Sequence, residues 1–373
     1  MLHVWNAAGE ELVSVPVEEL SSVRSLKRDL QRRCGFPRFR QVLMHEGIIL
    51  DDGATLVTPG DAQVVLLPFA PASQEDMLTF IIAVQNGLVH DVEEILRRPH
   101  DPNRPRTALV HASTRGHVEV VGLLLEAGAD KDGTDIDRTT GLQHASGRGH
   151  KEVVRLLLQA DANKDLADCQ GRTALMYASQ RGHAECERLL LKAKADKELA
   201  DKDGWTALIY ACSQGTEESV ALLLQAGAQS DLADHLERTA LIHAASRGHV
   251  EITRLLLKAR ASTGFADIDR TTGLVHASVQ GYAAVVRLLL EARADEELVR
   301  ETGKTAFRRA CAQGHMKVAR LLLAARVGGV LTSWCACSSR SWRRPGKFGV
   351  RSHDGMLPGS TSAVTAWQED AAG

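Results

Sequence analysis

Residues 107–125 read TALVHASTRGHVEVVGLLL, residues 140–158 read TGLQHASGRGHKEVVRLLL, and the pattern returns every 33 residues, seven times between Thr107 and Arg326. Each copy begins with Thr, has Gly nine residues later and ends in three consecutive Leu. The seven threonines are Thr107, Thr140, Thr173, Thr206, Thr239, Thr272 and Thr305. A period kept this strictly predicts a repeat architecture, in which stacked units build one continuous core.

Each copy predicts a helix, a turn, a second helix and a loop. The Thr is a suitable N-cap for the first helix, and the Gly is suited to end it in the left-handed conformation. Leu109, Val120 and Leu124 and their equivalents recur at helical spacing and predict the buried side. Aspartates at one loop position favour turns; they are Asp135, Asp168, Asp201, Asp234 and Asp267.

This pattern resembles the ankyrin family, whose unit starts T-P-L-H-x-A and continues through G-H to a Leu cluster. Here Ala or Gly replaces the Pro, and the His falls one place later, as in His111. The turn glycine is present in three loops and absent from four, so we expect those four to differ in shape. Residues 106–125 and 238–257 match at 14 of 20 positions, which indicates an internal duplication of four repeats.

Residues 1–69 carry no repeat and predict a small domain of two strands, a helix and further strands. Val13 and Val15 alternate with polar residues, and Val23, Leu26 and Leu30 form one apolar helix face. The segment from about Leu12 to Leu56 resembles ubiquitin, although His3 and Trp5 fall where the resemblance expects core aliphatic residues. Met44 falls where ubiquitin has an isoleucine of its recognition patch, so either a recognition surface or local packing explains it.

The resemblance stops before a diglycine tail, because Leu67 is followed by Pro68-Phe69-Ala70-Pro71. We therefore expect a fixed module that is not conjugated to a target. The module holds a basic segment, and two interpretations of it remain open: a solvated face, which is the commoner case, or a docking face for an acidic partner. The segment's residues are Arg24, Lys27, Arg28, Arg32, Arg33, Arg38 and Arg40.

Composition excludes several classes of function. The formal net charge of −2 argues against nucleic-acid binding, and no apolar stretch is long enough to span a membrane. The seven cysteines are mostly far apart, which fits a reducing compartment, the cytoplasm or the nucleus. Neither a nucleotide, hydrolase or metalloprotease motif nor a metal-ligand set is recognisable, so we expect no enzyme, no metal and no cofactor.

One exposed column is a candidate binding surface. One arginine stands directly before the glycine that ends the first helix in four of the copies, and Gln occupies this position in the other copies. The four arginines are Arg115, Arg148, Arg181 and Arg247. Arginine at this position either contacts an acidic partner or only complements the helix dipole.

The sequence thus predicts a mainly α chain: an ankyrin-repeat solenoid at residues 74–326, with a degenerate first repeat and seven full ones, preceded by an α+β ubiquitin-like β-grasp domain at 1–69. Residues 327–373 lose all periodicity and predict a disordered tail. The expected function is a scaffold or adaptor that binds other proteins through the array, with the module as a second docking site. The alternative is a substrate-reading subunit of a ubiquitin ligase or proteasome-associated complex.

Overall fold

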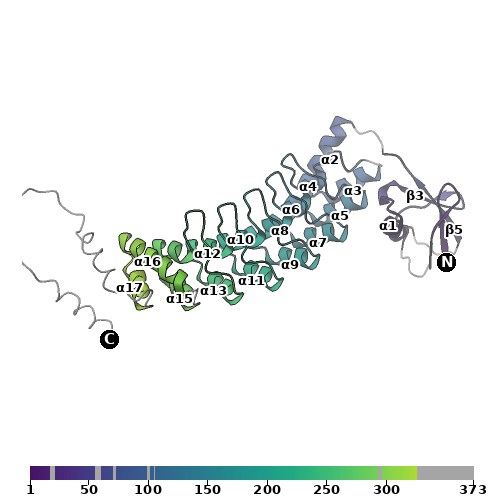
Figure 1. Ribbon diagram of the computed structural model, residues 1–373. Helices are drawn as coiled ribbons and strands as arrows, with labels where there is room; N and C mark the ends of the chain where they lie inside the picture. The colour runs from purple at the N-terminus through teal and green to yellow at the C-terminus, as the bar shows by residue number, and fades with distance from the viewer. Residues whose placement is uncertain are drawn as a thin grey trace, which may run out of the picture. The chain divides into compact units, whose positions relative to one another are not determined.

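The computed structural model describes residues 1–16, 22–54, 60–69, 73–98, 101–104, 106–292 and 296–325, without the side chains of 296–303. The predicted tail, with Cys335, Cys337 and three tryptophans, lies outside the described residues, as does Val17. Within the described part, a five-stranded sheet with one long helix precedes a row of stacked helix pairs (Figure 1).

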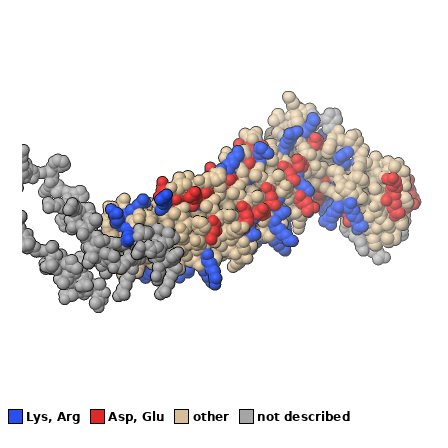
Figure 2. Space-filling model, in the orientation of Figure 1, with Lys and Arg blue, Asp and Glu red and all other residues tan. Residues whose placement is uncertain are grey.

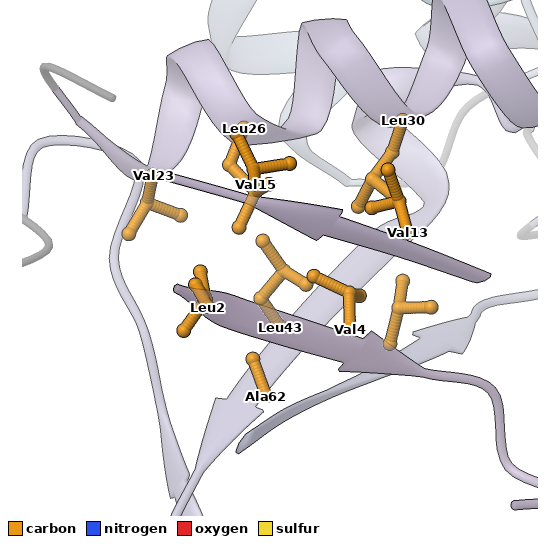
Figure 3. Close-up of a cluster of buried hydrophobic side chains, with 10 residues drawn as sticks. Leu2, Val4, Val13, Val15, Val23, Leu26, Leu30, Leu43 and Ala62 are labelled. Atoms are coloured by element: carbon orange, nitrogen blue, oxygen red, sulfur yellow. The ribbon is translucent and has the colours of Figure 1, made fainter. Parts of the chain in front are cut away.

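The N-terminal module is a mixed sheet with helix α1, Val23–Cys34, packed on one face. The strands lie in the order β2-β1-β5-β3-β4. They are β1 Leu2–Trp5, β2 Glu11–Val15, β3 Gln41–His45, β4 Ile48–Ile49 and β5 Gly60–Leu66, and a 3-10 turn, Arg38–Arg40, precedes β3. Leu26 and Leu30 of the helix meet Val13, Val15 and Leu43 of the sheet in one buried core (Figure 3). This arrangement is the ubiquitin-like β-grasp fold that the sequence predicted.

The first strand corrects one expectation. His3 and Trp5 do not enter the core; Leu2 and Val4 are buried instead, and β1 pairs in parallel with β5. Side chains alternate between the faces of a strand, so a shift of one residue exchanges the buried and exposed sets. The first strand is therefore shifted by one residue from the position that the resemblance to ubiquitin implies.

The array begins with the predicted irregular pair, α2 Gln74–Asn86 and α3 Val89–Arg97. Inner helices then alternate with outer helices, and each packs on its equivalents in the neighbouring repeats (Figure 1). The inner helices are α4 Ala108–Arg115, α6 Gly141–Arg148, α8 Ala174–Arg181, α10 Ala207–Gln214, α12 Ala240–Arg247, α14 Gly273–Gln280 and α16 Glu296–Ala312. The outer helices are α5 Val118–Glu126, α7 Lys151–Gln159, α9 Ala184–Lys192, α11 Glu217–Gln225, α13 Val250–Lys258, α15 Ala283–Glu291 and α17 Met316–Ala324.

Five loops between repeats, which we call fingers, use the same turn; they begin at the finger aspartates Asp135, Asp168, Asp201, Asp234 and Asp267. The expectation that fingers without the turn glycine differ in shape is wrong for the three fingers of this set that lack it, while Pro105 lies outside the described residues. Arg138, Glu237 and Arg270 adopt φ values of 60°, 59° and 55°, in the same left-handed region as Gly171 and Gly204. In all five fingers the amide of this residue donates to the carbonyl of the finger aspartate, three residues earlier. The hydrogen bonds of the turn therefore override the preference for glycine.

The predicted threonine N-caps are correctly placed in six repeats. The hydroxyls of Thr140, Thr173 and Thr206 accept a bond from the first turn of their helices, whereas those of Thr107, Thr239 and Thr272 do not. The seventh N-cap is wrong, because α16 begins at Glu296 and runs through Thr305. Arg300 stands where five other loops have the turn-forming Asp, so the helix continues where a finger was expected.

A second column of side chains ties consecutive repeats together. His117, His150, His183 and His315 each donate from Nε2 to a backbone carbonyl of the preceding repeat, at 2.9–3.2 Å. Thr216 makes the equivalent bond to Ser179 at 3.0 Å. These histidines satisfy carbonyl groups near the ends of inner helices, which explains why the sequence repeats them.

Candidate protein-binding surface

The finger aspartates shape the base of each finger. In the third repeat, Asp168 Oδ1 accepts bonds from the backbone amides of Gln170 and Arg172, both at 2.8 Å. The other four aspartates accept the equivalent pair of amides. The predicted role of these aspartates in the turn is therefore confirmed.

The second carboxylate oxygen of each finger aspartate binds a side chain of the inner helix. The donors are His144 at 2.8 Å, Tyr177 at 2.7 Å, Tyr210 at 2.6 Å, His243 at 2.9 Å and His276 at 2.7 Å. Burial alone would raise the pKa of Asp168, but the bonds from Tyr177 and from the backbone outweigh it and hold that pKa below its usual range. Each finger is thus fixed to its own helix by a charge-assisted hydrogen bond.

Aromatic and arginine side chains gather at the finger bases in the middle of the array. The Trp205 ring lies 5.1 Å from the Tyr210 ring and 4.7 Å from the His243 ring, measured between centroids. The Arg172 guanidinium lies 4.7 Å above the Tyr177 ring. We call this group the central cluster; its members are Arg172, Tyr177, Trp205, Tyr210, Arg238 and His243.

The central cluster is held in place yet remains accessible. Arg172 and Arg238 pair with Asp168 and Asp234 at 3.0 and 3.1 Å, and each arginine side chain keeps 31% of its surface exposed. The aromatic rings of Tyr177, Trp205 and Tyr210 are half-buried. Rigid aromatic residues beside arginine are typical of the residues that dominate protein interfaces.

Sequence reasoning missed the central cluster, although a signal was present. The position before the N-cap threonine is Arg, Thr or Lys in every copy except the fourth, where it is Trp205. The helix position that carries His in four copies carries Tyr177 and Tyr210 in two adjacent copies. In a chain with only 4% aromatic residues, these coinciding departures mark the central repeats.

The predicted arginine column lies beside this cluster. Arg115, Arg148, Arg181 and Arg247 are exposed, and each is the last residue of its inner helix. Arg148, Arg181 and Arg247 each stand four residues after the His or Tyr that binds a finger aspartate, and Arg115 stands four residues after the equivalent His111, so the two columns share one helix face. Arg247 also donates to Ser213 of the preceding repeat. Lys and Arg alternate with Asp and Glu along the array, without a large area of one sign in the view of Figure 2.

Met44 lies in the module, on the face of the sheet that does not carry α1. It pairs with Ile49 across β3 and β4, so the two side chains point to the same side of the sheet. Ile48 and Ile49 are 68% and 67% exposed. Met44 therefore belongs to a small apolar surface at one edge of the sheet.

Comparison with known families matches the array. The model described as "Ankyrin repeats (3 copies)" matches residues 80–168, 123–201, 160–234, 186–271 and 229–298, which together cover more than half of the chain. No curated protein matches the chain. Among the described residues no helix is long and apolar enough to cross a membrane, and in the same part of the chain no three His, Cys, Asp or Glu side chains form a metal-binding group.

Proposed function

The chain belongs to the ankyrin-repeat family, and from this premise we propose that it is an interaction scaffold whose central cluster is the main contact for a partner protein. Ankyrin repeats are in general non-enzymatic modules that bind proteins. The cluster carries the proposal because it combines rigid aromatic rings, ordered guanidinium groups and partial exposure at one place on the finger side of the array.

We propose that the arginine column extends this contact toward carboxylates of the partner. Arg115, Arg148, Arg181 and Arg247 share a helix face with the central cluster, and guanidinium groups are suited to bidentate carboxylate contacts. An exposed charge pair contributes only about 0.2–1 kcal/mol. No single arginine should therefore dominate, whereas the loss of a central aromatic anchor should.

The experiment compares proteins captured by the full chain with those captured by variants. Trp205→Ala should weaken binding of the specific partner about 30-fold or more, as expected for an interface hot spot. Tyr282→Ala is the control, since Tyr282 is exposed but lies outside the cluster. Equal loss in both variants, or none in Trp205→Ala, would contradict the proposal.

The four-arginine variant, with Gln at each position, separates the two interpretations of the column. Partner binding should fall several-fold and depend less on salt. If the arginines only complement helix dipoles, the melting temperature falls and partner affinity stays unchanged.

We propose the apolar surface around Met44 as a second docking site, in a protein that acts in the cytoplasm or nucleus. Membership of a ubiquitin-ligase or proteasome-associated complex is the finer form of this proposal and rests on the module's resemblance to ubiquitin. Met44→Asp should remove the partners of the module and spare those of Trp205. If Met44 only packs locally, the substitution lowers stability without changing the set of partners.

A further inference from the structure

The basic helix of the module faces two glutamates of the array. Arg24 Nη2 lies 2.9 Å from Glu93 Oε1, and Arg28 Nε lies 2.7 Å from Glu126 Oε1. Gln31 Nε2 donates to the carbonyl of Leu125 at 2.9 Å. Glu93 belongs to α3, the second helix of the irregular first pair, and Glu126 belongs to α5, the first of the outer helices.

Arg38 is the centre of this contact. Its side chain is fully buried, and it binds Asp52 at 3.0 Å, Glu93 at 3.2 Å and Glu126. Only Asp52 belongs to the module, and it also binds Lys27 at 2.7 Å. Burial alone would raise the pKa of Asp52, but Lys27 and Arg38 outweigh it and lower that pKa. A buried guanidinium needs such partners, and without the array Arg38 would lose two of its three carboxylates.

Most later repeats carry no acidic residue at the positions of the two glutamates. At the position of Glu126 they carry Gln159, Lys192, Gln225, Lys258, Glu291 and Ala324. Glu93 stands six residues after Gly87, the glycine that ends α2. At the same distance from the equivalent glycine, later repeats carry Gly122, Arg155, Arg188, Ala221 and Arg254. The repeat fold accepts neutral or basic residues at both positions, so stacking of the repeats does not require the acidic pair.

A close approach of backbone and ring shows a fitted surface as well as matched charge. A Cβ on Gly128 would lie 2.8 Å from Pro37 Cγ and 3.1 Å from Pro37 Cβ. Asp161, Lys194 and Arg260 occupy the equivalent turn at φ values of 57–63°, so the backbone conformation alone does not require glycine. Gly227 has the same conformation and nothing within 4 Å of its Cβ position. At residue 128, unlike residue 227, any larger side chain would therefore also collide with Pro37.

We propose that helices α3 and α5 of the array are a docking surface for the module's own basic segment, held by Arg38, Glu93 and Glu126. The acidic partner that the basic segment fits is thus the same chain. Docking leaves the face of the sheet that carries Met44 and Ile49 open, because α1 lies on the other face. The inference is independent of which protein binds the central cluster.

A cysteine pair tests the proximity in the full chain. Cysteines at Pro37→Cys and Gly128→Cys would have Cβ atoms near the 3.5–4.5 Å separation of a disulfide after a small relaxation. With oxidised glutathione the pair should close at least about tenfold faster than the control pair Pro37→Cys with Gly227→Cys. Peptide mapping identifies the new disulfide among the seven native cysteines. Equal rates for the two pairs overturn the proposal.

Charge variants test what holds the contact. Glu93→Arg combined with Glu126→Arg should slow closure of the Gly128 pair to the rate of the Gly227 pair, while Gln159→Arg leaves it unchanged. Dichroism verifies that helical content is retained. The milder Glu→Gln double variant should give a smaller decrease, and this decrease should shrink as salt screens the charges of the wild type. A closure rate that does not respond to either glutamate variant overturns the role of the charges.

Discussion

Replacement of Glu187 should make the array more stable, and only at neutral or higher pH. Glu187 lies in α9, fully buried; neither carboxylate oxygen makes a hydrogen bond of ordinary geometry among the described residues, and the hydroxyls of Ser219 and Ser179 stabilise the ionised form only weakly against burial. Four other repeats have valine at this position, namely Val121, Val154, Val220 and Val286. A buried carboxylate without ordinary hydrogen-bond partners is costly in its charged form, whereas valine fits the same space in the same packing.

The size of the effect follows from the shifted titration. Burial raises the pKa of Glu187 from 4.5 to about 7; Glu218 adds to the rise, and Ser219, Ser179 and Arg188 oppose it. The proton is therefore held more tightly in the folded chain than in the unfolded chain. This tighter proton binding contributes to the free energy of unfolding. The contribution is fully present below pH 4.5 and is lost as the pH rises through about 7. At 1.36 kcal/mol per pKa unit, the ionised form costs about 3 kcal/mol of unfolding free energy above that pH.

Urea unfolding followed by far-ultraviolet dichroism at pH 5 and pH 8 measures this cost. The gain from Glu187→Val should be about 2–3 kcal/mol larger at pH 8 than at pH 5, because the wild-type carboxyl is mostly protonated at the lower pH. Glu187→Gln should show the same difference between the two pH values. Glu185→Gln, on the exposed side of the same helix, is the matched control and should show little difference. A gain from Glu187→Val that is equal at both pH values would refute the reasoning.

Three further predictions concern other parts of the array. Thr140→Ala should lower the free energy of unfolding by about 1 kcal/mol. The hydroxyl of Thr239 is buried without a partner among the described residues, so Thr239→Ala should lower it less, and thermal unfolding measures the difference. Burial would raise the pKa of Asp234, but bonds from Arg238 and His243 lower it below 3.8. Its stabilisation is present above pH 3.8 and lost as the pH falls below it, so Asp234→Asn should lose less stability than wild type between pH 6 and pH 3. Burial raises the pKa of the Cys186 thiol to about 11, so alkylation at pH 8 should be on the order of a hundredfold slower in the folded than in the urea-unfolded chain.

The repeat was predictable from sequence because its signals are local. The period, the caps and the turn glycines act within a few residues of one another, and the structure places the inner and outer helices where the spacing predicts them. Two sequence predictions that were wrong also have local causes. At Arg300 the loss of one turn-forming Asp lets a helix run through an expected N-cap, and at β1 a shift of one residue exchanges the faces of a strand.

The central cluster and the module's docking contact were not predictable because they join distant residues. Trp205 meets His243 only after two repeats stack, and Arg38 meets Glu126 only after the module folds against α5. The sequence indicated which columns depart from the repeat, but it did not show which departures meet in space. The basic segment shows the same limit: its charge was evident, while its partner lay 88 residues further along the chain.

Several departures from the repeat pattern lie together in the central repeats, and their grouping favours a functional origin. Glu187 places a poorly compensated carboxylate in the same repeat as Tyr177, and Trp205 stands in the next repeat. Sequences that fold well are locally consistent, and exceptions tend to occur where function requires them. The outer end of the array shows no comparable exception in its described core, where Val285, Val286 and Leu289 are ordinary buried aliphatic residues. One outcome is that Trp205→Ala abolishes partner binding and Glu187→Val leaves it unchanged; the buried carboxylate and the binding surface are then neighbours that do not affect each other. The other outcome is that both substitutions change the affinity for the partner, and the central repeats then sacrifice part of their stability for recognition.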